Sequence, residues 1–117
     1  MSKMVTGRIA EAAVERWMTD RGYSIVARNA RVGRLELDLI ARRGGLLVIC
    51  EVRSRRGSLV DPALTFDKSK RERIRRGALT YWAEHGRGAQ LRIDAAAVTF
   101  APDGSPDVRY YENVFCD

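Results

Sequence analysis

Residues 34–53 read RLELDLIARRGGLLVICEVR, two apolar runs separated by a pair of glycines. In the first run, over residues 34–42, apolar and polar side chains alternate, which predicts a strand with two distinct faces. One face would hold Leu35, Leu37, Leu39 and Ala41, and the other Glu36, Asp38 and Ile40. The second run, over residues 46–54, is apolar on both faces as far as Glu51, which is typical of a central strand. The stretch therefore predicts two neighbouring strands.

The glycine pair sets the register of these strands. Two adjacent glycines suit the positive φ angles of a tight hairpin turn, and a two-residue turn fixes which residues oppose each other. Counting outward from the turn predicts three opposed pairs, which are Arg43 with Leu46, Asp38 with Glu51, and Glu36 with Arg53.

The opposed pair Asp38 and Glu51 carries the chemistry. Opposed side chains have β-carbons about 4.5–5.5 Å apart, where two like charges are destabilising. A divalent cation removes this conflict, because Mg²⁺ prefers hard oxygen ligands, and it would also polarise a phosphodiester and activate a bound water. The alternative is structural: one acid points to solvent, or each is neutralised by an arginine such as Arg42 or Arg53.

Helical and strand spacing predict two elements before this hairpin. Apolar residues recur at helical spacing over residues 7–21, and Gly22 suits the end of that helix. Glu11 lies beside the apolar stripe, so its carboxylate either reaches the sheet or stays at the surface. A short strand is expected over residues 23–29, with residues 31–33 breaking the pattern before the next strand.

More elements follow the hairpin, after a connection over residues 57–66. A helix is expected over residues 67–84, with a capping box of Ser69 and Glu72 and a buried stripe of Ile74, Ala78, Tyr81 and Trp82. A strand over residues 91–100 should lie parallel to the strand before the crossover. The sequence then predicts a turn over residues 102–104 and an edge strand over residues 108–115.

Charge favours a polyanionic partner. The chain has 117 residues, a length that suits a single domain over residues 1–117, with a net charge of +6 and a pI of about 9.9. Most basic residues are Arg, a bias that genome composition alone can produce. They crowd beside the two acids, however, as a phosphate-binding rim requires. The predicted nucleic-acid contacts are Arg55, Arg56, Lys68, Lys70, Arg71 and Arg73.

Hydropathy and cysteine content bear on the compartment. No uncharged stretch is long enough to cross a bilayer or to form a signal peptide, so we expect no membrane association and a cytoplasmic location. Cys50 and Cys116 are too few for a disulfide scaffold, which fits a reducing compartment.

Five segments match one known pattern in order and spacing: Gly7 with Glu11, ELDLIA over residues 36–41, VICEVR over residues 48–53, Lys70 with Arg73, and NVF over residues 113–115. Together they resemble the YraN-like uncharacterised protein family. That family is similar to the PD-(D/E)xK nuclease superfamily, which includes archaeal Holliday-junction resolvases and type II restriction enzymes. The resemblance implies an α/β fold with a restriction-endonuclease-like core, a mixed β-sheet flanked by helices in the order α-β-β-β-α-β-β.

The resemblance also implies a metal site and a partner. Asp38 and Glu51 take the two motif acids that bind Mg²⁺ (or Mn²⁺), and Glu11 takes the helix glutamate that completes many such sites. Glu36 matches a family acid of unassigned role. DNA is implied more strongly than RNA, and related resolvases act as dimers, which points to a homodimer.

One departure concerns catalysis. Where the family motif ends in Lys, this chain has Arg53, and a guanidinium cannot be deprotonated at accessible pH, although its charge can still hold a water or stabilise a pentavalent phosphate. Lys70 falls one turn before Ile74 on the buried stripe of its helix and offers a replacement ammonium. The alternative is that Lys70 contacts only solvent or a phosphate.

Three functions remain open from the sequence. The first is a metal-dependent endonuclease that hydrolyses phosphodiester bonds in DNA, including structured or branched DNA, with catalytic residues Glu11, Asp38, Glu51, Arg53 and Lys70. The second is a non-catalytic nucleic-acid-binding module whose nuclease site is degenerate at Arg53. The third is an interaction protein whose acids are salt-bridged and whose Arg content is purely compositional.

Overall fold

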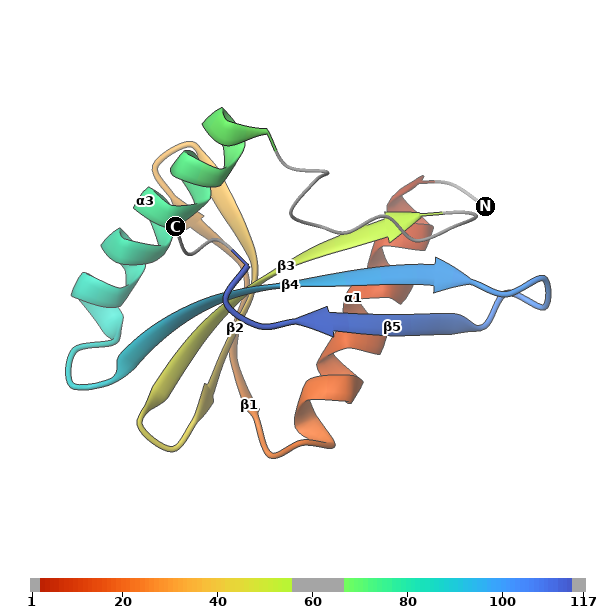
Figure 1. The fold of residues 1–117 in the computed structure, drawn as a ribbon, viewed down its shortest axis with the longest axis horizontal. Coiled ribbons are helices and arrows are strands. Elements are labelled where there is room, and N and C mark those ends of the chain that lie inside the picture. The colour runs from red at the N-terminus through yellow and green to blue at the C-terminus, as the bar shows by residue number, and fades with distance from the viewer. Residues whose placement is uncertain (1–2, 56–66, 115–117) are drawn as a thin grey trace.

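A five-stranded sheet in the order β1-β2-β3-β4-β5 forms the centre of the protein (Figure 1). The structure is a computed structural model that describes residues 3–55 and 67–114. Its elements are α1 (Lys3–Thr19), β1 (Ser24–Val32), β2 (Leu35–Arg43), β3 (Leu46–Arg55), α3 (Lys68–His85), β4 (Gln90–Phe100) and β5 (Pro106–Tyr111). This order and the mixed sheet confirm the predicted fold class.

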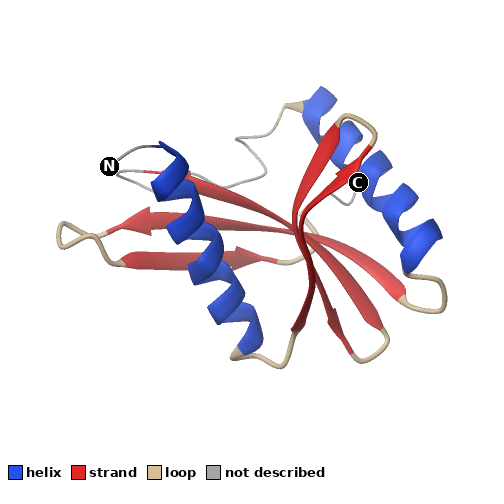
Figure 2. Ribbon diagram, turned by 180° about the vertical axis from the view of Figure 1, so that it is seen from behind, coloured by secondary structure: helices blue, strands red, loops and turns tan. Residues whose placement is uncertain are grey.

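The two helices cover opposite faces of the sheet, as Figure 2 shows from behind. Two apolar cores result, because each helix buries one stripe against one sheet face. The α3-side core holds Leu37, Ile40, Leu47, Ile49, Ile74, Ala78, Ala89, Ile93 and Ala95. The α1-side core holds Ala10, Val14, Met18, Tyr23, Leu39, Ala41, Val48, Cys50, Ala96 and Val98.

The sheet is antiparallel except between β3 and β4. That parallel pairing runs without a break from Leu46 opposite Gln90 to Arg55 opposite Thr99. It confirms the predicted crossover, since parallel strands need a long connection that returns across one face of the sheet.

Both tight turns contain glycine at positive φ. Arg43 pairs with Leu46 around Gly44, whose φ is 59°, so the predicted glycine turn is confirmed. β1 continues to Val32, which pairs with Leu35 around Gly33 at a φ of 61°. The predicted break over residues 31–33 was therefore wrong, because a two-residue turn needs only the glycine and its neighbour.

The helix ends differ in detail from the sequence prediction. α1 starts at Lys3, before the predicted start at residue 7, and Gly22 follows its end with a φ of 89°. The side chain of Asp67 caps α3 by accepting a hydrogen bond from the backbone N–H of Lys70 at 2.7 Å. The predicted Ser69–Glu72 capping box was wrong, because Asp67 already occupies the cap position and Ser69 lies inside the first turn.

The C-terminal edge strand is shorter than predicted. Gly104 turns the chain at a φ of 88°, as expected, and β5 then pairs with β4 as far as Tyr111. Beyond it Asn113 has a φ of 58°, and its backbone N–H donates to the Asp94 carboxylate at 2.8 Å instead of to a strand. Phe115, the predicted strand end, lies outside the described residues.

The side chains of β2 switch from one face of the sheet to the other at Asp38. Leu37 belongs to the α3-side core, whereas Leu39 belongs to the α1-side core, so the even alternation predicted for this strand was wrong here. The hydrogen-bonded pairing of β2 with β3 ends at Leu39 and Cys50. On the other side of β2, Asn29 of β1 lies opposite Asp38 and has a φ of 50°. The tip of the β1–β2 hairpin consequently turns toward α3 (Figure 1).

Within the part of the chain that the structure describes, neither helix is long and apolar enough to span a membrane.

Candidate metal and nucleic-acid site

Asp38 and Glu51 lie where β2 and β3 separate. The backbone N–H of Asp38 donates to Oε2 of Glu51 at 3.0 Å, and the backbone N–H of Val52 donates to Oδ2 of Asp38 at 2.8 Å. The carboxylates thus replace the ladder bonds that would continue past Leu39 and Cys50. The predicted neighbours are brought together, but the predicted opposition of Glu36 and Arg53 is not formed, because the ladder has already ended.

Burial makes these two carboxylates hard to ionise together. Glu51 is 5% exposed, and burial followed by the charge of Asp38 raises its pKa to about 8. The pKa of Asp38 is also raised, mainly by burial, although the hydrogen bond from Val52 opposes the change. Asp38 is half-buried and Glu51 is buried, and two neighbouring acids with raised pKa values are an environment in which a bound cation stabilises the ionised forms.

Two cations act on this pair. Lys70, half-buried in the first turn of α3, lowers the pKa of both Asp38 and Glu51, and it does so more than Arg53 does. The residue that departs from the family motif is therefore the weaker of the two positive charges at the site. The prediction that Lys70 faces the sheet agrees with this electrostatic coupling.

Glu11 lies nearby on α1 but is engaged elsewhere. Burial raises its pKa first, and the charges of Asp38, Glu15 and Glu36 raise it further. With its amide nitrogen turned toward them, Asn29 donates to Oε1 of Glu11 at 3.1 Å and to Oε1 of Glu36 at 3.3 Å. Across residues 3–55 and 67–114 no three acids, histidines or cysteines form a metal-ligating group, so Glu11 is not brought into one with the pair.

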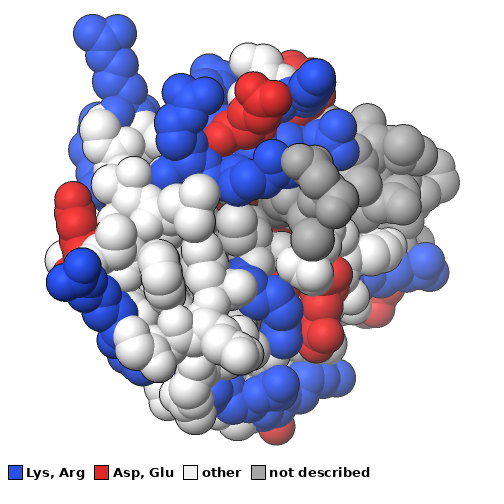
Figure 3. Space-filling model, turned by 60° about the vertical axis from the view of Figure 1, so that its left-hand side comes forward, with Lys and Arg blue, Asp and Glu red and all other residues white. Residues whose placement is uncertain are grey.

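The predicted nucleic-acid contacts lie along α3 and at the end of β3. Lys68 and Arg73 are exposed and Arg71 is half-buried, while Arg55 is the last residue of β3. Arg56 lies outside the described residues. On the side of the molecule that carries α3, Lys and Arg side chains surround a largely uncharged area (Figure 3).

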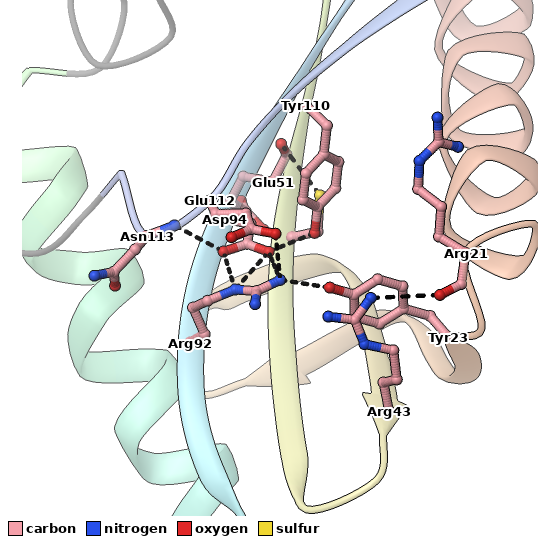
Figure 4. Close-up of polar contacts among 10 residues, drawn as sticks. Arg21, Tyr23, Arg43, Glu51, Arg92, Asp94, Tyr110, Glu112 and Asn113 are labelled. Carbon is pink, nitrogen blue, oxygen red and sulfur yellow. Dashed lines mark hydrogen bonds and ion pairs between the residues drawn. The ribbon is translucent and has the colours of Figure 1, made fainter.

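A buried polar cluster on the opposite face was missed by the sequence analysis (Figure 4). Asp94 is fully buried. Arg92 donates hydrogen bonds to its carboxylate from Nε at 2.9 Å and from a terminal nitrogen at 2.8 Å. The hydroxyl of Tyr110 donates to Asp94 at 2.5 Å, and Arg92 also donates to the hydroxyl of Tyr23 at 2.6 Å. This cluster joins β4, β5 and the start of β1, and its only signal in the sequence was a charged residue inside an apolar strand.

The family model "Uncharacterised protein family UPF0102" matches residues 10–98. The chain belongs to this family. UPF0102 protein sce2912 of Sorangium cellulosum is 42% identical over 119 residues, a match that covers 97% of this chain and 83% of that protein. UPF0102 protein STH1475 of Symbiobacterium thermophilum is 38% identical, with 98% of each chain covered. The resemblance to the YraN-like family is thereby confirmed for this UPF0102 protein.

The fold is also similar to that of a solved structure. SfsA of Pyrococcus furiosus, determined in complex with Ca²⁺, superposes with a TM-score of 0.51 at 15% identity. The match covers 95% of this UPF0102 chain and 64% of the SfsA chain. At this identity the likeness concerns the fold alone.

Proposed function

We propose that this UPF0102 protein binds nucleic acid and hydrolyses its phosphodiester bonds with the help of a divalent cation held by Asp38 and Glu51. The observation that carries the proposal is the pair of carboxylates at the fork of β2 and β3, Glu51 buried and Asp38 half-buried, together with the positive charge of Lys70 beside it. Groups with raised pKa values that converge with a charged partner are concentrated at functional sites.

The donor set fits Mg²⁺ or Mn²⁺. Each carboxylate accepts a hydrogen bond from one backbone N–H through one of its two oxygens. The other oxygens, Oδ1 of Asp38 and Oε1 of Glu51, take no part in these two hydrogen bonds. Mg²⁺ is commonly held by one or two carboxylates and completes its shell with water and substrate oxygen, so two acids suffice. When bound, such a cation supplies Lewis acidity and lowers the pKa of a water. The Ca²⁺ in SfsA supports a hard-cation site on a similar fold.

The remaining residues have assigned roles in this proposal. Lys70 takes the place of the motif lysine, because it acts on both carboxylates more strongly than Arg53 does, and it orients the attacking water. Arg53 stabilises the negative charge that develops on the phosphate. Glu11 is not grouped with the pair as a metal ligand in the described residues, so its proposed role is that of a base.

Substrate binding is assigned to the basic residues of α3 and β3. Lys68, Arg71 and Arg73 lie within three residues of Lys70 on the same helix, so we assign to them contacts with phosphates that flank the one at the carboxylates. We propose DNA rather than RNA on the strength of the family resemblance.

A second candidate function rests on Arg53. If the site requires a lysine at this position of β3, the protein is a nucleic-acid-binding module without cleavage. Its binding would be independent of metal and would weaken steeply with salt. In that case Arg53→Lys creates cleavage that the wild type lacks.

The test is cleavage of labelled single-stranded, duplex, flapped and four-way-junction DNA, with Mg²⁺, with Mn²⁺ and with chelator. The wild type is compared with Asp38→Asn and with Asp107→Asn, a matched control at an exposed acid of β5. We expect metal-dependent cleavage by the wild type and the control, and none by Asp38→Asn. Cleavage by Asp38→Asn at the wild-type rate would overturn the proposal, and binding without cleavage by every protein would favour the second candidate.

A further inference from the structure

A cavity of about 410 Å³ lies between the tip of the β1–β2 hairpin and α3. Val32 and Leu35 line it from the hairpin, and Gly77 lines it from the helix. The hairpin reaches α3 here because Gly77 has no side chain, since a β-carbon on it would clash with Cδ2 of Leu35. The cavity therefore has an apolar floor that depends on the close approach of two elements.

Three arginines line the same cavity. Arg34 comes from the turn of the hairpin, and Arg73 and Arg76 come from positions three residues apart on α3. All three are exposed, and within residues 3–55 and 67–114 no ion pair is recorded for any of them. Planar guanidinium groups bind phosphate through paired hydrogen bonds, so arginines from two elements around one hollow suit a phosphate better than a lone surface charge does.

The cavity and the carboxylate pair both involve neighbouring residues of β2 and α3. Leu35 precedes Asp38 by three residues on β2, a separation of about 10 Å along a strand. Arg73 follows Lys70 by three residues on α3, which is about 4.5 Å of helix rise.

Resting on the proposed function, we infer that this cavity binds one nucleotide of the substrate strand close to the scissile phosphate. The phosphate lies between Arg34, Arg73 and Arg76. The base lies on the apolar floor of Val32 and Leu35. The volume of about 410 Å³ falls near the lower end of the usual range for small-molecule sites, which suits a single nucleotide.

The test is binding of a fluorescein-labelled 15-nucleotide single-stranded DNA, and of the same sequence as RNA, by anisotropy in chelator across a salt series. Arg34→Ala and Arg76→Ala are compared with Arg109→Ala, a charge-matched control at an exposed position of β5. We expect each cavity variant to weaken binding about tenfold and to lower the salt slope by about one, as loss of one phosphate contact does. The control should change the dissociation constant less than about twofold.

The possible outcomes separate the two proposals. Equal losses in Arg34→Ala, Arg76→Ala and Arg109→Ala would overturn the cavity as a site and leave nucleic-acid binding standing. Absence of binding by the wild type even at low salt would overturn the proposed function and this inference with it. A selective loss on only one of the two probes supports the site and identifies the sugar that it accepts.

Discussion

Leu37 and Leu39 flank Asp38 on β2, and their side chains pack into the two opposite cores of the protein. The backbone therefore turns over at Asp38, and this turn brings the carboxylate onto the backbone N–H of Val52 in β3. A buried N–H that loses its acceptor costs about 1–3 kcal/mol. Asp38 consequently stabilises the fold as well as supplying charge.

This double role predicts that two substitutions of Asp38 differ in stability. Asn keeps an oxygen that can accept from Val52, whereas Ala does not. We expect Asp38→Ala to unfold more easily than Asp38→Asn by about 1–3 kcal/mol in urea at pH 8 with chelator. Neither variant should bind a divalent cation. Equal stabilities would show that the Val52 N–H does not depend on this oxygen.

A second prediction concerns pH. The pKa of Glu51 is about 8 in the folded protein and near 4.5 otherwise, so the folded state binds the extra proton between these values. Without metal, the contribution of Glu51 to the free energy of unfolding should be greatest below pH 4.5. It should fall as the pH rises toward 8. A shift of this size corresponds to at most about 5 kcal/mol.

Urea denaturation at several pH values in chelator measures this dependence. Glu51→Gln should flatten it, whereas Glu84→Gln, at an exposed position of α3, should leave it unchanged. Added Mg²⁺ should raise the free energy of unfolding at pH 8 in the wild type, which has both carboxylates, but not in Glu51→Gln. A wild-type stability that rises steadily from pH 5 to pH 8 in chelator would contradict the raised pKa.

A third prediction separates the two cations at the site. Lys70→Ala should lower the cleavage rate by about 10²-fold or more, the usual scale for loss of a group that moves or orients a proton. Lys70→Arg should not restore the rate, because a guanidinium keeps its proton. Arg109→Ala, at an exposed position of β5, is the control. Identical losses in Lys70→Ala and Arg109→Ala would show that Lys70 acts only as a surface charge.

A fourth prediction tests the contact between the hairpin and α3. Gly77→Ala introduces a β-carbon that clashes with Cδ2 of Leu35, so the Leu35 side chain must move, and this strain should cancel the gain of about 1 kcal/mol in helix propensity. Gly7→Ala in α1 meets nothing within 4 Å, so it should stabilise the protein by about 1 kcal/mol through helix propensity alone. Thermal unfolding measures both. If Gly77→Ala stabilised the protein as Gly7→Ala does, the hairpin would not rest on the helix as described.

Local rules explain what could be predicted from the sequence. The glycine turn fixes Arg43 opposite Leu46, and counting from it places Asp38 beside Glu51. This works because hairpin register depends only on the turn and on the alternation of neighbouring residues. The helix that carries Lys70 was likewise predictable from its apolar spacing.

The failures have tertiary causes. The face change at Asp38 depends on the separation of β2 from β3 and on the backbone of Asn29 in a different strand, which no local pattern of β2 encodes. The cluster around Asp94 was missed because its partners come from two other parts of the chain, Tyr23 near the N-terminus and Tyr110 and Asn113 near the C-terminus.

The carboxylate pair also bears on the order of folding. Asp38 and Glu51 are 13 residues apart in one hairpin, whereas the parallel pairing that begins at Leu46 and Gln90 must wait for the whole crossover to close. Short loops close at low entropic cost, and non-local pairings form slowly. The two acids therefore come together early in folding, and they repel each other before α3 brings Lys70 close enough to reduce the repulsion. A divalent cation bound at that stage would accelerate folding itself, in addition to slowing unfolding.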